Sequence, residues 1–253
     1  MYCKNCDHLL HDNFCARCGQ NAKVDRLNFP SFLTEISDSI FQLNRGFLYT
    51  IKELFTRPGH TIRDFIQGKR KNHFKPIAFV LTLSTIYFFV SQIFDNSTLI
   101  DDFITGYSDG GDEHRLKASS SSILNWLSNN YAYTTLLLLP LFSLASFISF
   151  NGFGQNYLEH MVINSYITGQ QAIFYSLFMI MGVIIKNEDI TVLLAVITCF
   201  LFNCWAFSQF YLDKKRIKVI SRLIISYFLY IFFISVFLIV LTFGLIKNNR
   251  NRF

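Results

Sequence analysis

The stretch that decides the fold is Arg57–Ser91, RPGHTIRDFIQGKRKNHFKPIAFVLTLSTIYFFVS. Its first half is basic and is interrupted at Pro58 and Gly68. Its second half, from Pro76 onward, is apolar and begins a run close to the 20 residues that a helix needs to cross a bilayer. Basic residues gather on the cytoplasmic side of such spans. The basic residues where the two halves meet therefore predict a cytoplasmic N-terminus followed by a mainly membrane-embedded chain.

The composition is that of a helical membrane protein with several spans. Of the 253 residues, 51% are hydrophobic and 29 are Phe, and the mean hydropathy is +0.32, which is too apolar for a soluble domain of this size. The fold class predicted is all-α, with about five transmembrane helices in a domain that covers 75–253. The predicted spans are 76–94, 132–150, 161–185, 190–212 and 219–246.

The first 20 residues predict a zinc ribbon. Each of two CxxC turns directs two sulfurs at one point, and together they supply the four thiolates of a closed structural zinc site. A segment this small has almost no core, so the metal would supply its folding free energy. The alternative is two disulfides, which need an oxidising compartment, and the opening of the chain does not read as a signal peptide. The predicted ligands of Zn²⁺ are Cys3, Cys6, Cys15 and Cys18.

Residues 21–74 predict a polar linker and amphipathic helices that lie in the cytoplasm or at the membrane interface. An apolar residue recurs every three or four positions from Phe29 to Leu54, with a break near Gly46. Pro58 suits the first turn of the next helix, and Gly68 suits its end. The basic residues that follow are either ordinary positive-inside anchors or a specific contact for anionic lipid. They are Arg57, Arg63, Lys69, Arg70, Lys71 and Lys75.

Charge also predicts the orientation of the later spans. The loop from Asp95 to Asn130 is acidic and is expected outside, whereas residues 213–222 carry five basic residues and are expected inside. Five spans then place the C-terminus outside. The basic residues Lys247, Arg250 and Arg252 oppose that last assignment.

The third predicted span carries polar residues on one face. His160, Asn164, Thr168 and Gln171 follow one another at helical spacing, and Glu159 lies beside them. Polar groups are costly in lipid, so this face is expected to look into the bundle. It serves either as hydrogen-bonding contact between helices or as an intramembrane path or headgroup site.

The opening CKNCDHLLHDNFCARCGQ resembles the short zinc ribbons at the N-termini of many bacterial membrane proteins. Together with RGFLYTIKELFTRPGHTIRDFIQGKRKNHFKPIAFVLTLS, it resembles domain of unknown function 3667, found mostly in Bacteroidota. The resemblance covers roughly residues 1–95 and is specific in RPG, in GKR and in Pro76. It implies a cytoplasmic zinc ribbon and a multi-span membrane domain, and it implies no activity.

These features favour an adaptor or scaffold of the bacterial inner membrane, whose ribbon presents a surface to a cytoplasmic or membrane protein. A transporter or channel that uses the polar face of the third span is the alternative. A lipid-acting enzyme is less favoured, because only Glu159 and His160 offer catalytic groups; no catalytic residue is assigned. Nucleic-acid binding is not expected, because basic and acidic residues nearly balance in the ribbon.

Overall fold

The computed structural model describes residues 1–253 apart from 25, 29–45, 95, 99, 103–125 and 251–253. Helices dominate this part of the chain, and its only β-type pairings are isolated bridges in the first 21 residues. Five helices are long and apolar enough to cross a membrane, which confirms the prediction of a multi-span, all-helical membrane protein. They are α4 (Pro76–Ile93), α7 (Tyr131–Ser149), α8 (Tyr157–Ile185), α9 (Glu188–Phe210) and α10 (Arg216–Arg250).

The helix that carries the third span begins at Tyr157, before its predicted start at 161, because its first turn is capped. The Asn156 side chain accepts a hydrogen bond from the Glu159 backbone, and the Glu159 carboxylate accepts one from the Asn156 backbone at 2.8 Å. This reciprocal arrangement, the capping box, satisfies the free N–H groups at a helix start. α10 likewise begins before its predicted start, at Arg216, since a polar first turn stays helical outside the apolar run.

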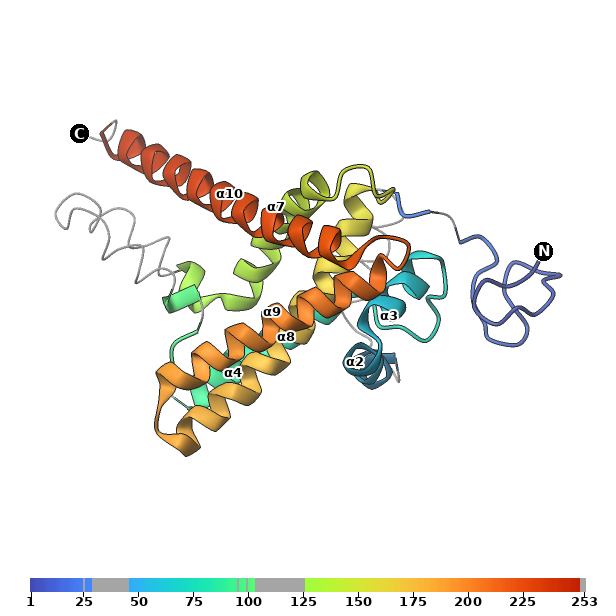
Figure 1. Ribbon diagram of the computed structural model, residues 1–253, viewed down its shortest axis with the longest axis horizontal. Helices are drawn as coiled ribbons and strands as arrows, with labels where there is room; N and C mark the ends of the chain where they lie inside the picture. Colours follow the sequence, from blue (N-terminus) through green and yellow to red (C-terminus); the bar gives the residue numbers. More distant parts are fainter. Residues whose placement is uncertain (25, 29–45, 95, 99, 103–125, 251–253) are drawn as a thin grey trace.

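The spans divide into two groups that meet at one end. α4, α8 and α9 run side by side, and α7 packs with α10 while also contacting α4 and α8 (Figure 1). The two groups diverge away from this meeting point. We call the end where they meet the ribbon end, because the N-terminal residues, α2 (Gly46–Thr56) and α3 (Pro58–Ile66) all lie there.

Local sequence signals set α3 as predicted. Pro58 occupies the first turn, where its missing N–H has no cost, and Gly68 follows the helix with φ +109°, a conformation that favours glycine. The Thr50 hydroxyl of α2 accepts a 2.8 Å hydrogen bond from the Phe74 backbone and so fixes the turn after α3. The amphipathic segment expected from Phe29 to residue 45 and most of the acidic loop lie outside the described residues.

Aromatic side chains join α3 to the spans. The buried Tyr166 ring of α8 lies 5.5 Å from Phe65 of α3 and 5.6 Å from Phe79 of α4, measured between ring centroids. Its hydroxyl donates a 2.6 Å hydrogen bond to the Phe74 carbonyl. Edge-to-face pairs of this kind stabilise a core beyond the area they bury. One residue of α8 therefore anchors both the turn and the first span.

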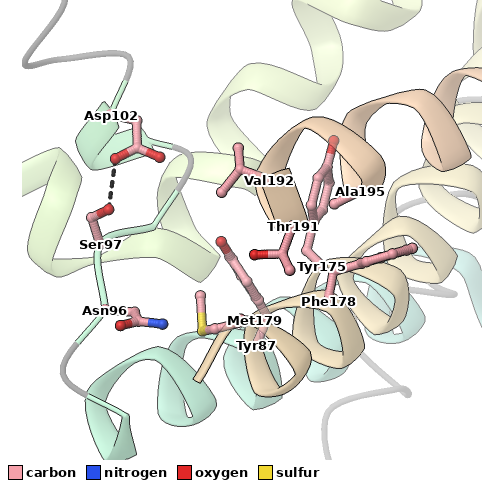
Figure 2. Close-up of a pocket in the computed structure, with 11 residues that line it drawn as sticks. Tyr87, Asn96, Ser97, Asp102, Tyr175, Phe178, Met179, Thr191, Val192 and Ala195 are labelled. Carbon is pink, nitrogen blue, oxygen red and sulfur yellow. Dashed lines mark hydrogen bonds between the residues drawn. The ribbon is translucent and has the colours of Figure 1, made fainter. Parts of the chain in front are cut away.

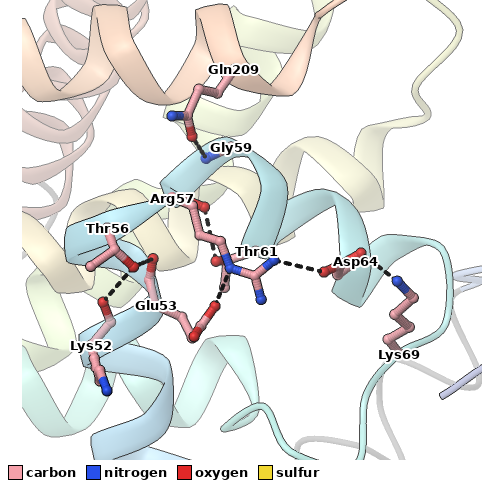
Figure 3. Close-up of polar contacts among 9 residues, drawn as sticks. All are labelled: Lys52, Glu53, Thr56, Arg57, Gly59, Thr61, Asp64, Lys69 and Gln209. Carbon is pink, nitrogen blue, oxygen red and sulfur yellow. Dashed lines mark hydrogen bonds and ion pairs between the residues drawn. The ribbon is translucent and has the colours of Figure 1, made fainter. Parts of the chain in front are cut away.

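The RPG sequence allows α3 to touch the end of α9. A Cβ atom placed on Gly59 would lie 2.3 Å from the Phe210 nitrogen, so no larger residue fits without a shift. The Gly59 N–H donates to the Gln209 side chain at 3.2 Å (Figure 3). Arg63 donates to the Gln209 carbonyl at 3.0 Å and to the Phe210 carbonyl. A cation at the last carbonyls of a helix also complements the helix dipole.

We expect Gly59→Ala to destabilise the protein. In an open helix, exchange of glycine for alanine stabilises by about 0.5–1 kcal/mol, whereas overpacking costs about 1–3 kcal/mol. Contact with the α9 backbone makes the second effect larger here. Thermal unfolding in detergent measures the change, with His60→Ala on the same helix as control. An unfolding temperature equal to or above that of the wild type would contradict the close contact.

Candidate metal centre and buried polar cluster

The two CxxC turns have the same backbone structure. In the first, the Asp7 N–H donates to the Cys3 carbonyl at 2.9 Å, and in the second the Gly19 N–H donates to the Cys15 carbonyl at 2.8 Å. Both turns close on a residue with positive φ, 56° at Asp7 and 70° at Gly19. The isolated bridges Tyr2–Leu9 and Phe14–Asn21 complete two equivalent knuckles. Glycine adopts this conformation without strain, and aspartate is one of the few other residues that tolerate it.

The knuckles bring four thiols to one point. The Cys3 and Cys18 sulfurs lie 3.6 Å apart, as do those of Cys6 and Cys15, and all four lie within 4.8 Å of one another. A tetrahedral zinc site with Zn–S bonds of about 2.3 Å has edges of about 3.8 Å between its sulfurs. The four side chains therefore fit one tetrahedral metal ion, and all four ligand positions would be filled by protein.

Backbone N–H groups prepare part of this set for a metal. Hydrogen bonds from the Cys18 and Arg17 backbone lower the pKa of Cys15 to about 6, so this thiol gives a thiolate near neutral pH. For Cys6, a hydrogen bond from the His8 backbone acts in the same direction, but burial and the neighbouring thiols raise its pKa to about 12. A metal cation among the sulfurs would stabilise the thiolate forms, because it would offset the unfavourable interaction between neighbouring sulfurs.

Gln20 attaches the knuckles to the membrane domain through hydrogen bonds to the turn after α3. Its buried side chain donates to the Gly68 carbonyl at 2.9 Å and accepts from the backbone N–H groups of Arg70 and Lys71 at 3.1 and 3.2 Å. A Cβ atom on Gly68 would lie 2.9 Å from the Lys4 side chain. The GKR turn is therefore the surface on which the metal-binding segment rests.

A second anchor follows in the linker. Arg26 binds both carboxylate oxygens of Glu159 at 2.8 Å and donates to the Gly154 carbonyl at 2.8 Å. The Glu159 side chain is only 5% exposed, and its hydrogen bonds raise the pKa of Arg26. Glu159, which the prediction grouped with the polar face of the third span, lies in the first turn of α8 at the ribbon end. The N-x-x-E pattern from Asn156 could have revealed this cap.

Several of the basic residues considered for lipid contact have partners within the protein. Arg57 pairs with Glu53 and lies 3.9 Å from Asp64, which also binds Lys69 at 3.0 Å (Figure 3). The hydrogen bond to Glu53 raises the pKa of Arg57. Arg63 caps α9 as described above. The remaining three differ in exposure: Arg70 stacks over the Phe65 ring, Lys71 is exposed and Lys75 is half-buried.

The polar face of α8 looks into the bundle, as predicted, at His160 and Asn164. Both are buried, and both meet Ser146 of α7: the Ser146 hydroxyl lies 3.1 Å from the His160 ring nitrogen Nδ1 and accepts from the Asn164 amide at 2.8 Å. Thr168 is half-buried. This contact is a hydrogen-bonded seam between α7 and α8, the arrangement that stabilises helix pairs in lipid.

Gln171 belongs to a separate contact. Its amide donates to the Asn203 side chain of α9 at 3.2 Å, and Asn203 in turn donates to the Tyr227 hydroxyl of α10. The four residues of the predicted face therefore do not form one site. Sequence reasoning missed Ser146, Asn203 and Tyr227, although each is a polar residue within an apolar run, the signal that identified the face on α8.

A small cavity lies at the opposite end of the bundle, between α4, α8 and α9. Its lining includes Tyr87, Tyr175, Thr191 and Asp102 (Figure 2). The Asp102 carboxylate accepts a 2.6 Å hydrogen bond from Ser97, which also lines the cavity. Its volume is about 50 Å³, whereas sites for small organic ligands have about 300–1,000 Å³. This cavity has room for a few water molecules. None of its lining residues belongs to the α7–α8 seam.

We expect Asn164→Leu to lower the stability of the folded protein by about 0.6–2 kcal/mol, because it removes a hydrogen bond between helices that lipid cannot replace. Ser165→Ala is the matched control, since the Ser165 hydroxyl bonds only to its own helix, at the Met161 carbonyl. Unfolding in detergent measures both variants. A normally stable Asn164→Leu protein that has lost its cellular function would instead indicate a path or binding site.

Comparison with known proteins finds one family. Residues 44–88 match the model of a protein family described as "Protein of unknown function (DUF3667)". The matched segment contains α2, α3, the GKR turn and most of α4, which is the surface that holds the knuckles and the end of α9. No curated protein and no solved structure matches the chain. Over these 45 residues the chain is similar to this domain of unknown function.

Proposed function

We propose that this protein is an adaptor of the bacterial inner membrane, in which a structural zinc ribbon at residues 1–20 presents a surface to a protein partner. One observation carries the proposal: the knuckles are attached to the membrane domain while their outer side chains stay exposed. Gln20 and Arg26 make the attachment. Large apolar side chains remain outside, with 72% of Met1, 68% of Tyr2 and 62% of Phe14 exposed.

A bound metal ion would allow these apolar side chains to stay exposed, because it would replace a hydrophobic core as the source of folding free energy. In a small domain without metal, residues such as Tyr2 and Phe14 would have to form the core. Here Tyr2 and Phe14 occupy equivalent positions, one residue before Cys3 and Cys15, and the metal would hold the fold in their place. A closed four-thiolate shell leaves no position for substrate. Exposed aromatic residues on a rigid module favour protein recognition.

Charge supports a cytoplasmic ribbon. The turn between α9 and α10, which is basic from Lys214 to Arg222, lies at the ribbon end (Figure 1), whereas Asp102 lines the small cavity at the opposite end of the bundle. The positive-inside rule places the basic end in the cytoplasm. Four free thiols at that end suit a reducing compartment, where zinc rather than disulfides would join them.

A transporter or channel is the second candidate, and a lipid-acting enzyme is a weaker one. His160, Asn164 and Gln171 of α8 have partners on α7 and α9, and the small cavity lies at the far end, which favours helix contact over a path. Glu159 is held by Arg26 and its cap, so it does not converge with another acid or base on a reacting position.

Purified protein is expected to contain about one zinc ion per chain, because there is one set of four thiols. Cys15→Ser should remove the metal and leave membrane insertion intact, since the spans pack against one another independently of the four thiols. Cys204→Ser, at a half-buried thiol in α9, is the control and should keep the metal. Elemental analysis of detergent-purified protein gives the ratio. Metal-free wild type with disulfide-bonded cysteines would contradict the zinc site.

The adaptor role is tested at the exposed aromatic residues. We expect Tyr2→Ser combined with Phe14→Ser to keep zinc and span folding but to lose a co-purifying protein that the wild type retains. Leu48→Ser, at an apolar residue of α2 that is 73% exposed, is the control and should keep it. Quantitative mass spectrometry after purification in mild detergent compares the three. Equal partner recovery from all of them would contradict recognition through the knuckles.

A further inference from the structure

We propose that the first turns of α10 and the Phe153 turn form a binding site for a phosphate group. Three cations gather over one aromatic ring: the charged groups of Lys214, Lys218 and Arg222 lie 5.6, 5.7 and 5.8 Å from the Phe153 ring centre. These are not the basic residues of the GKR turn. The ligand is an anion with several oxygens, presented by a lipid headgroup or by a soluble phosphate.

The first argument is an imbalance of charge. In the described part of the chain, Lys214, Lys218 and Arg222 form no ion pair with an acidic side chain. The buried carboxylate nearby, Glu159, is bound on both oxygens by Arg26, which also bonds to Gly154 in the same turn. The Phe153 ring attracts cations, but their mutual repulsion remains. An anion placed among them would remove it.

The second argument is the fixed position of the arginine. Arg222 donates a hydrogen bond to the Ser149 carbonyl at the end of α7, and the Ser149 hydroxyl donates to the Arg222 carbonyl. This reciprocal pair holds the guanidinium in place while leaving other N–H groups for a ligand. A guanidinium with parallel donors matches two oxygens of a phosphate, and exposed lysines add charge around it.

The third argument comes from the helix dipole. The first turn of α10 contains no acidic residue, and it carries the site residue Lys218. The start of a helix favours negative charge, so this cation opposes the dipole of a 35-residue helix. A phosphate bound beside Lys214 and Lys218 would complement both the side chains and the helix start.

A buried donor also remains unused beside the turn. The Tyr211 ring meets the Phe153 ring edge-on, with centroids 5.0 Å apart and an angle of 87°. Tyr211 is 5% exposed, and its hydroxyl has no hydrogen-bond partner within the described residues. Burial raises the pKa of this hydroxyl, so it stays protonated as a donor. Buried polar groups normally have partners, and because this hydroxyl has almost no accessible area, a ligand oxygen would pair with it only after a local opening of the turn.

The site lies where phosphate is abundant. The candidate span Arg216–Phe237 begins at these residues, with Lys218 and Arg222 in its first two turns, so we place the three cations near the lipid headgroups on the ribbon end. Basic residues at this depth attract anionic lipid. A soluble phosphate compound would use the same donors, and the two sources separate experimentally.

The test uses the full chain in mild detergent and a double variant, Lys214→Gln with Lys218→Gln. Lys215→Gln with Arg216→Gln is the matched control, because it removes the same charge from neighbouring positions that have no contact with Phe153 within the described structure. Arg222 is left unchanged because it also joins α7 to α10. The probes are phosphatidylglycerol, phosphatidylcholine and inorganic phosphate, titrated while native mass spectrometry and thermal unfolding record binding.

The wild type should bind phosphatidylglycerol in preference to phosphatidylcholine. The site variant should lose about 25-fold in affinity, because each of its two basic residues at a headgroup contributes roughly fivefold, and the control should lose less than about threefold. Stronger binding of inorganic phosphate than of the anionic lipid would retain the site and assign it to a soluble ligand. Equal losses from the two variants would overturn the proposal, because the cations would then act as a general charged belt, as would absence of binding by either phosphate probe.

Discussion

The ion pair between Arg26 and Glu159 determines how the N-terminal segment sits on the membrane domain. Glu159 is needed where it is, because its carboxylate caps the first turn of α8. Burial of that carboxylate would be costly without a partner, and Arg26 supplies one from the linker, next to Leu27, which is itself buried in the core. The helix cap and the position of this part of the linker therefore share one carboxylate.

The segment that matches the family of unknown function makes contacts that explain its Pro and Gly residues. Pro58 and Gly59 let α3 reach the end of α9, and Gly68 lets the knuckles approach the turn after α3. An added Cβ on Gly59 would collide with the backbone of α9, and Gly68 has φ +109°, a conformation that favours glycine, so each supports packing between segments far apart in the sequence. This part of the chain is a platform that holds the N-terminal knuckles against the spans.

Sequence reasoning succeeded where one local pattern determines the outcome. Runs of apolar residues identified five spans, and the CxxC spacing identified four thiols that the structure places together. It failed where the answer depended on a distant partner. Arg26 looked like one charge of a polar linker, and Glu159 looked like a member of a polar face, because nothing in either local sequence encodes their pairing. Asn203 and Tyr227 escaped notice for the same reason.

Polar side chains find their partners differently within the spans and at the ribbon end. Within the spans, His160 and Asn164 meet Ser146, and Gln171 meets Asn203, because lipid offers no alternative partner. At the ribbon end, water and headgroups are available, so an imbalance can persist without unfolding the chain. The unmatched cations over Phe153 and the exposed aromatic residues of the knuckles both lie at that end. Packing among the described residues needs neither feature, which is why both of our proposed contacts with other molecules lie at the ribbon end.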